Sequence, residues 1–253
     1  KTAIDAGTLQ LGAGGDVGSL ASGSDADFVN NSTFIINRSN AVEIFQNISG
    51  SGDVVQQGTG TTTLTGTNTH SGTTTINDGT LVAGSADALT NARVVIADAA
   101  NATLQLIDYN STIDRLSGGG STGGTVDLGG KTLSVGRDNQ STAFAGVIEG
   151  TGALVKQGTG TFTLSGPSTF SGGTTIEEGV VKLGVSTVEA NGSITSGALG
   201  TGSVTVAPAS GKAAALDLAG FNLANALSLT GTGVSNSGGL YNSSSTGSLV
   251  SGS

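Results

Sequence analysis

The sequence predicts an all-β protein, a parallel β-solenoid, and two observations lead to that fold class. Residues 48–82 recur at residues 148–182 with an offset of 100 and no gap, and 19 of the 35 aligned positions are identical. Of the 253 residues, 44 are glycine and 2 are proline. Repeated segments that are rich in threonine and punctuated by glycine are typical of chains that stack like units along an axis.

The composition disfavours both a helical fold and a disordered chain. Glycine and the β-branched Thr, Val and Ile are weak helix formers, and no window has apolar residues at helical spacing for more than one turn. Hydrophobic residues make up 36% of the chain and the mean hydropathy is +0.13. That share is too high for a disordered, solvated chain. Short strands are the structure that remains.

Four strands are predicted in the first copy of the repeat, at residues 53–56, 61–65, 73–76 and 80–83. Each is followed by Gly, Asn or Asp, the residues that form tight turns. The spacing of apolar residues then predicts the coil length, because the centres of alternate strands lie about one coil apart. Val55 and Ile76 lie 21 residues apart, and Leu64 and Val82 lie 18 apart.

Coils of about 20 to 25 residues, stacked about 4.8 Å apart, predict roughly ten to twelve coils and a rod of roughly 50 to 60 Å. We expect residues 1–253 to form a single solenoid segment. Its parts are full repeat motifs at 48–84 and 148–184, a partial repeat at 1–12 in which Gly7 to Gly12 match Gly79 to Gly84, a glycine-rich loop at 117–125, and a loose C-terminal end at 235–253.

The interior is predicted to be a stack of aliphatic side chains. Each coil buries little by itself, so stability is close to a sum of contacts between neighbouring coils. The predicted interior residues are Ile48, Val55, Leu64, Ile76 and Leu81 in the first copy, and Ile148, Val155, Leu164, Ile176 and Val181 in the second.

Charge and cysteine content exclude several classes of function. Nine basic and eighteen acidic residues give a net charge of -9, and the cations are scattered, so nucleic acid is not an expected partner. The chain has no cysteine, so ladder hydrogen bonds and stacked side chains must stabilise it. No run of 18 apolar residues predicts a membrane span, and no leader pattern is present.

Acidic residues are candidate catalytic groups, because β-helical enzymes use acids on adjacent coils for proton transfer. Glu177 and Glu178 are adjacent and correspond to Asn77 and Asp78, which predicts solvated turn residues. The strongest remaining cluster comprises Asp108, Asp114 and Arg115, where the two acids could meet across a turn beside Tyr109. No third group completes it, so no catalytic residue is predicted.

His70 is the only histidine, and Phe170 occupies the equivalent position. We therefore predict a flat ring packed beside a turn rather than a metal ligand. No zinc or EF-hand pattern occurs, and no metal or cofactor site is predicted. The glycines at 58–60 and 118–120 lack the lysine and helix of a phosphate-binding loop, and we expect them to relieve positive-φ strain at corners.

Threonine runs at 61–63 and 73–75 would place stacked hydroxyl and methyl groups on a solenoid face. Regular threonine ladders can bind ice or sugars. The pattern occurs at two places rather than on every coil, so we interpret it as strand-forming residues on a soluble face.

One stretch resembles a known family. The chain reads VVQQGTGTTTLTGTNTHSGTTTINDG from Val54 and LVKQGTGTFTLSGPSTFSGGTTIEEG from Leu154. This string is similar to the autotransporter-associated β-strand repeat of bacterial autotransporter passengers. The resemblance implies a right-handed parallel β-helix stalk on, or released from, a bacterial surface, commonly in adhesins.

On this basis we expect a non-enzymatic, extracellular structural or adhesive stalk that assembles end to end into fibres. Expected partners are other copies of the chain or neighbouring repeats, end to end or side by side, and host-cell or matrix glycans or proteins. An outer-membrane anchor would lie outside this fragment. A β-helical module that binds carbohydrate, with Tyr109 stacking on a sugar, or cleaves polysaccharide remains the alternative. The sequence leaves open whether an acidic turn binds calcium.

Overall fold

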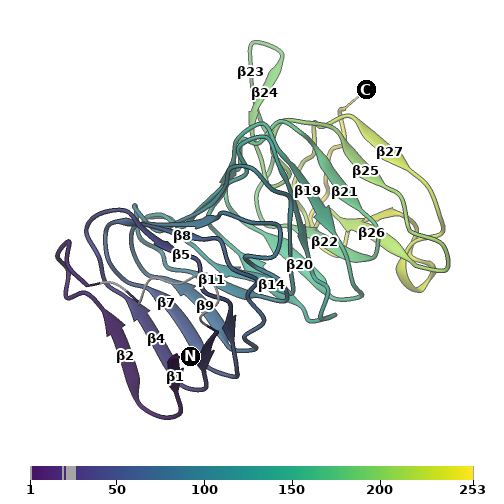
Figure 1. The fold of residues 1–253 in the computed structure, drawn as a ribbon. Coiled ribbons are helices and arrows are strands. Elements are labelled where there is room, and N and C mark those ends of the chain that lie inside the picture. The colour runs from purple at the N-terminus through teal and green to yellow at the C-terminus, as the bar shows by residue number, and fades with distance from the viewer. Residues whose placement is uncertain (1, 19, 21–26, 253) are drawn as a thin grey trace.

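The computed structural model describes residues 2–18, 20 and 27–252, and nearly all of their regular structure is β-strand. The one helical element among them is a short 3-10 turn, Val234–Asn236. Figure 1 shows the strands stacked as successive turns from the N-terminal to the C-terminal end. The predicted parallel β-solenoid is confirmed.

One sheet runs the length of the molecule, and we call it the long sheet. It contains eleven parallel strands. Each of the solenoid's turns, about eleven in all, contributes one strand, which agrees with the predicted ten to twelve coils. The strands are β2 (Thr8–Leu11), β4 (Thr33–Ile36), β7 (Asp53–Gln56), β9 (Thr73–Ile76), β11 (Arg93–Ile96), β14 (Arg115–Gly118), β17 (Thr142–Phe144), β20 (Thr161–Leu164), β22 (Gly179–Leu183), β26 (Ala214–Asp217) and β28 (Leu240–Tyr241).

Three shorter parallel sheets form the rest of the wall. A three-stranded sheet contains β1 (Thr2–Ile4), β3 (Phe28–Asn30) and β6 (Ile48–Ser49). The early sheet contains β5 (Val42–Ile44), β8 (Thr61–Leu64), β10 (Thr80–Ala83), β12 (Thr103–Leu106), β15 (Thr125–Asp127) and β18 (Val147–Glu149). The late sheet contains β13 (Ser111–Ile113), β16 (Thr132–Val135), β19 (Ala153–Lys156), β21 (Thr174–Ile176), β25 (Val204–Val206) and β27 (Leu227–Leu229).

The one antiparallel pair among the described strands is a hairpin of β23 (Val188–Ala190) and β24 (Ser193–Ser196). Asn191 and Gly192 join the strands with φ of 53° and 76°, as a two-residue hairpin turn requires. The hairpin lengthens its coil, because Lys182 pairs with Asp217, 35 residues later, whereas Leu164 pairs with Leu183 after 19. Figure 1 shows it projecting from the stack.

The core is a continuous column of apolar side chains, with edge-to-face rings of Phe28 and Phe34 near the N-terminal end (centroids 4.8 Å apart). Most predicted interior residues are buried: Ile48, Leu64, Ile76, Leu81, Ile148, Leu164, Ile176 and Val181.

The prediction is wrong at Val55 and Val155, which face outward and are half-exposed. Their neighbours point inward instead: Val54 and Gln56 in the first copy, and Leu154 and Lys156 in the second. Side chains alternate along a strand, so placing one residue on the wrong side reverses the whole strand.

The predicted stacking pairs are wrong by one residue for the same reason. Gln56, not Val55, pairs with Ile76, and Leu64 pairs with Ala83 rather than Val82.

The two copies of the repeat lie on different faces of the solenoid. In the first copy, β7 and β9 belong to the long sheet and β8 and β10 to the early sheet. In the second, β19 and β21 belong to the late sheet and β20 and β22 to the long sheet. The repeat is thus a two-coil corner that can be built at different corners of the same solenoid.

The partial copy also changes face, because β2 (Thr8–Leu11) lies in the long sheet whereas the matching β10 lies in the early sheet. Near the C-terminal end, Leu240 and Tyr241 fall in a segment predicted to be a loop, yet they pair with Leu216 and Asp217 of the preceding coil.

Corner glycines are required for two distinct reasons, of which the sequence predicts only positive φ. Gly118 has φ of 92°, as predicted. Gly58 is not in the positive-φ region, but an added Cβ would lie 2.1 Å from the main-chain oxygen of Arg38 in the preceding coil. There the close stacking of two backbones, rather than φ, requires glycine.

Candidate interaction site along one corner

Polar side chains gather at the corner where each strand of the late sheet turns into the long sheet. Strands β13, β16, β19 and β21 stack in register, so the residues that follow them also stack. Main-chain hydrogen bonds continue through the turn, for example from Gln157 N to Val135 O at 2.8 Å. The residues concerned are Asp114 and Arg115, then Arg137, Gln157, and Glu177 and Glu178. We call this column the corner ladder.

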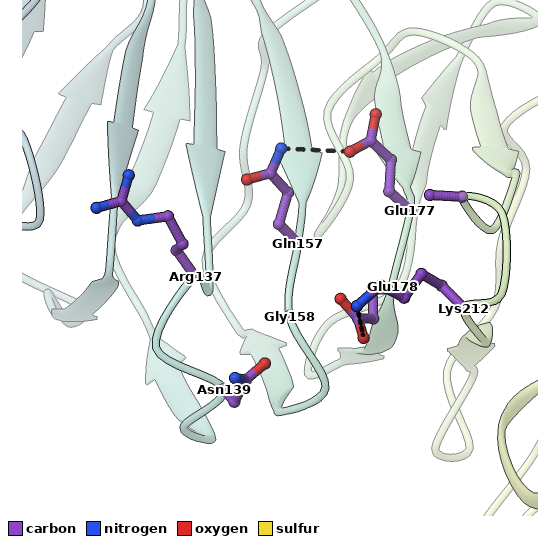
Figure 2. Close-up of a pocket in the computed structure, with 8 residues that line it drawn as sticks. Arg137, Asn139, Gln157, Gly158, Glu177, Glu178 and Lys212 are labelled. Carbon is purple, nitrogen blue, oxygen red and sulfur yellow. Dashed lines mark hydrogen bonds and ion pairs between the residues drawn. The ribbon is translucent and has the colours of Figure 1, made fainter.

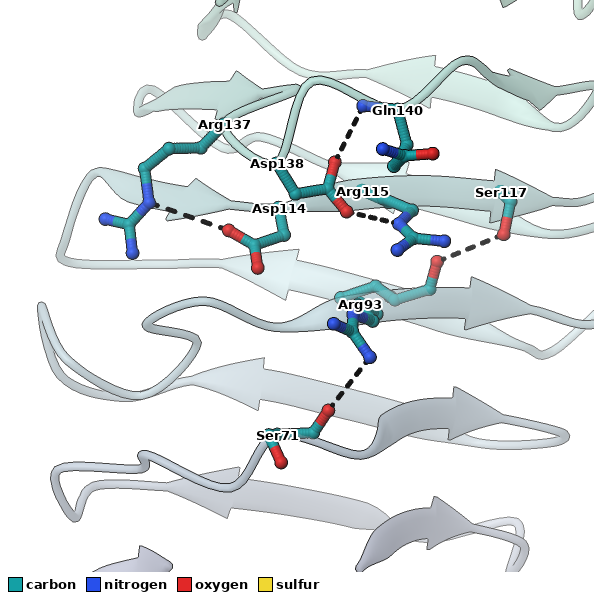
Figure 3. Close-up of polar contacts among 9 residues, drawn as sticks. Ser71, Arg93, Asp114, Arg115, Ser117, Arg137, Asp138 and Gln140 are labelled. Atoms are coloured by element: carbon teal, nitrogen blue, oxygen red, sulfur yellow. Dashed lines mark hydrogen bonds and ion pairs between the residues drawn. The ribbon is translucent and has the colours of Figure 1, made fainter. Parts of the chain in front are cut away.

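Ion pairs join two coils in the N-terminal half of the ladder (Figure 3). Arg137 Nε lies 3.5 Å from Asp114 Oδ1, and Arg115 Nε donates to Asp138 Oδ2. Partial burial raises the pKa of Asp114, the Arg137 guanidinium lowers it, and Asp138 raises it again. Two crossed pairs therefore hold the coils of β14 and β17 together.

The C-terminal half of the ladder borders a pocket of about 270 Å³ (Figure 2). Its lining mixes both charges with amides, from Arg137, Asn139, Gln157, Gly158, Glu177, Glu178, Ala209 and Lys212. Gln157 Nε2 donates to Glu177 Oε2 at 3.3 Å, and Lys212 Nζ lies 3.1 Å from Glu178 Oε1. None of the described residues that line this pocket is aromatic.

Beneath the pocket lies a lysine that we did not predict to be buried. Lys156 is 1% exposed, and its ammonium donates to the main-chain oxygens of Gln157 and Gly158, each at 2.6 Å, and of Glu178 at 3.2 Å. Burial lowers its pKa to about 8, against the opposing effect of Glu178. The signal that could have found it is the alignment of Lys156 with Gln56 in otherwise apolar strands.

The acidic residues considered as a catalytic cluster, Asp108 and Asp114, have separate surroundings. Asp114 pairs with Arg137 and Arg115 with Asp138, each across to the next coil, whereas Asp108 is exposed on the turn after β12. Tyr109 is 44% exposed beside it. Glu177 and Glu178 lie in the turn after β21, as predicted, and each has a polar partner there.

His70 is packed inside a corner, 2% exposed, with Nε2 3.0 Å from Thr74 Oγ1. Phe170 is fully buried at the equivalent position, which agrees with the predicted ring beside a turn. Burial lowers the pKa of His70, and the Asp53 carboxylate opposes this effect.

Within the described residues, no three His, Cys, Asp or Glu side chains come close enough to hold a metal ion. The same part of the chain includes no helix long and apolar enough to cross a membrane.

Comparison with known proteins bears on this corner, because its strands β19 to β22 lie in the second copy. The family described as passenger-associated-transport-repeat matches residues 54–83 and 154–183. The chain carries two passenger-associated transport repeats. The resemblance seen in the sequence is thereby confirmed, and the passenger repeats correspond to β7–β10 and β19–β22.

A curated relative is similar over part of the chain. Over 137 residues the chain is 39% identical to the adhesin BmaC autotransporter of Brucella suis biovar 1 (strain 1330). The match covers 53% of this chain and 4% of the relative, so the chain spans a small part of that protein. No solved structure matches the chain.

Proposed function

We propose that this chain is a stalk segment of an extracellular bacterial adhesin, exposed at the cell surface, and that it acts mechanically rather than as an enzyme. The observation that carries the proposal is an unbroken parallel sheet of eleven strands with two passenger repeats built into it. A solenoid of this kind resists bending because each coil is bonded to the next along its length. The similarity to an autotransporter adhesin supports a surface location.

The proposed partners follow from this role. Neighbouring repeats of a longer protein, or other copies of the chain, would stack end to end or side by side. Host-cell or matrix glycans or proteins would be held at a distance from the bacterium. In this proposal the corner ladder serves stability, because its charged groups are paired between coils.

Electron microscopy of the purified chain at rising concentration tests the stalk. About eleven coils at about 4.8 Å predict separate rods of roughly 50 to 60 Å. Fibres with a coil-scale repeat would add end-to-end assembly. Compact globules of similar length and width would contradict the proposal.

Surface exposure is tested separately with the projecting hairpin. An epitope inserted between Asn191 and Gly192 lies at a solvent-exposed turn outside the stack. Antibody should label intact cells that express the parent protein. Labelling that requires cell lysis would argue against a surface stalk. A screen for release of sugar from polysaccharides should show no turnover, and turnover lost in Asp114→Asn would contradict the non-enzymatic role.

A further inference from the structure

The outer face of the long sheet carries a strip of β-branched side chains on four consecutive coils. Ile35, Val55, Thr75 and Val95 pair in register, one from each of β4, β7, β9 and β11. All four are half-exposed. The same row continues with Gln10 before Ile35 and Ser117 after Val95, so the β-branched strip is bounded by polar residues. Figure 1 shows these strands side by side.

A second outward row runs beside the strip and continues after Arg93 with Arg115, whose charge is paired with Asp138. Over the four coils of the strip this row carries one charge of each sign. It comprises Thr33, Asp53, Thr73 and Arg93, again paired coil to coil. Asp53 and Arg93 each lie one coil from Thr73, at about 4.8 Å per coil, but on opposite sides of it. Both charged side chains are exposed.

Hydrogen bonds to the middle coil hold both charged side chains in place. Thr73 N donates to Asp53 Oδ1 at 2.7 Å. Arg93 Nη1 donates to Ser71 O at 3.2 Å, and Figure 3 shows this second contact. The anion and the cation thus lean toward the same coil from its two sides. The anion and the cation therefore lie at equal distances on the two sides of the coil that contains Thr73 and Thr75, so a half-turn about that coil exchanges their positions.

We propose that this face pairs with the same face of a second copy of the chain, with the two solenoid axes antiparallel. A twofold axis along β9 places Asp53 opposite Arg93 of the second copy, and Val55 opposite its Val95. Thr75 then faces its own counterpart. Isologous contacts of this kind require a self-complementary surface.

Charge also decides the orientation. If the two axes were parallel, each row would face the other row, and Asp53 and Arg93 would be pressed against the β-branched strip. Charges buried against apolar groups without a partner are costly. The antiparallel arrangement avoids this, and it would join stalks that point toward each other.

The pairing should be weak. A contact centred on β9 that extends three coils to each side, from β2 to β17, covers seven coils of about 4.8 Å. With strands of about four residues, the buried face is roughly 430 Å² per copy, about half of the ~800 Å² typical of a stable complex. The inference rests on the proposed stalk role only for its biological setting. Rod length tests the stalk, whereas the measurements below report mass and proximity, so the two can fail separately.

Sedimentation over rising concentration tests the contact, with an expected shift from 24.3 kDa toward twice that mass. Val55→Asp should abolish the shift. Val155→Asp is the matched control, because Val155 is the equivalent outward residue of the second passenger repeat, flanked by Ser134 and Thr175 on the late sheet. Equal loss in both variants, or no shift in the wild type, would overturn the proposal.

Charge reversal tests the orientation. Asp53→Arg or Arg93→Asp should each weaken dimerisation at least tenfold, and the double variant should restore it. Thermal unfolding of each variant shows whether the fold is intact. Failure of the double variant to recover, with the fold intact, would exclude the Asp53–Arg93 contact between copies.

Disulfide trapping provides a readout that does not depend on these substitutions, because the chain has no cysteine. Thr75→Cys should cross-link with itself under mild oxidation. Val55→Cys should cross-link poorly alone but efficiently when mixed with Val95→Cys. Equal self-linking of Thr75→Cys and Val55→Cys would indicate parallel packing and contradict the antiparallel pair.

Discussion

Lys156 of the second passenger repeat occupies the corner position that Gln56 holds in the first. Gln56 Nε2 donates to the main-chain oxygens of Gly58 and Gly60, at 2.7 and 3.2 Å. The Lys156 ammonium donates to two main-chain oxygens of its own turn, those of Gln157 and Gly158, and to that of Glu178 in the turn of the next coil. Both polar ends are buried at a turn and donate to its carbonyl groups from inside the solenoid, and Gly60 O also accepts from Thr80 N of the next coil at 3.0 Å.

A second difference between the two repeats accompanies the replacement of Gln56 by Lys156. The amide oxygen of Gln56 accepts from the Thr62 hydroxyl at 2.6 Å, whereas the residue equivalent to Thr62 is the buried Phe162. A buried amide oxygen needs a hydrogen-bond donor as its partner, whereas an ammonium group has only donor hydrogens and no acceptor atom. The lysine can therefore neighbour a phenylalanine, and the glutamine cannot do so without leaving its oxygen unpaired.

This coupling predicts a double-mutant cycle. Thr62→Phe should destabilise the chain by about 1–3 kcal/mol beyond any packing strain, because it leaves the buried Gln56 oxygen unpaired. Gln56→Lys combined with Thr62→Phe should recover part of that loss. Denaturant unfolding of the two single variants and the double variant measures the coupling. Additive effects would mean that the two positions are independent.

The buried lysine also predicts a dependence of stability on pH. The pKa of Lys156 is about 8 in the folded chain and about 10.5 in the unfolded one. Between these values the unfolded state holds a proton that the folded state has lost, so the free energy of unfolding should rise as pH rises from 8 to 10.5. Lys156→Gln should flatten this rise. Urea unfolding at pH 7, 9 and 10.5 compares the two proteins.

The buried His70 predicts that stability also depends on pH at the acidic end of the range. Burial lowers its pKa, so below about pH 6.5 the unfolded state binds a proton that the folded state resists, and stability should fall as pH falls. His70→Phe should reduce this loss, because Phe170 shows that the ring fits. Phe170→His, the reciprocal variant, should steepen it. Thermal unfolding at pH 5 and 7 decides, and an unchanged acid profile in His70→Phe would exclude His70 as its source.

Close coil stacking predicts the cost of corner substitutions. Gly58→Ala would place a Cβ within 2.2 Å of Arg38 N and O and should destabilise the chain by roughly 1–3 kcal/mol or more. Gly15→Ala is the control, because nothing lies within 4 Å of its added Cβ and its φ is not positive. A similar melting temperature for both variants would show that the corner can relax.

Strand positions could be predicted because turn residues separate them in both copies. The predicted strands at 53–56, 73–76 and 80–83 have the observed bounds, and the one predicted at 61–65 ends at Leu64. Which side of a strand faces inward could not be predicted at Val54-Val55 or Leu154-Val155. Two adjacent apolar residues give no alternation, and the decisive inward partners, Gln56 and Lys156, are polar.

The sequence by itself determined that this protein is a stack of parallel coils, because a 35-residue repeat of glycine, threonine and aliphatic residues can bury its apolar side chains only against like units. The tertiary structure decided which faces the two repeats occupy and which charges meet. Asp114 and Arg137 become neighbours only because a coil of 22 residues separates the paired Ile113 and Val135. Asp53 and Arg93 come to flank Thr73 on one face only because two successive coils of 20 residues separate Val55, Thr75 and Val95. Contacts between coils are long-range, so local patterns could not reveal them.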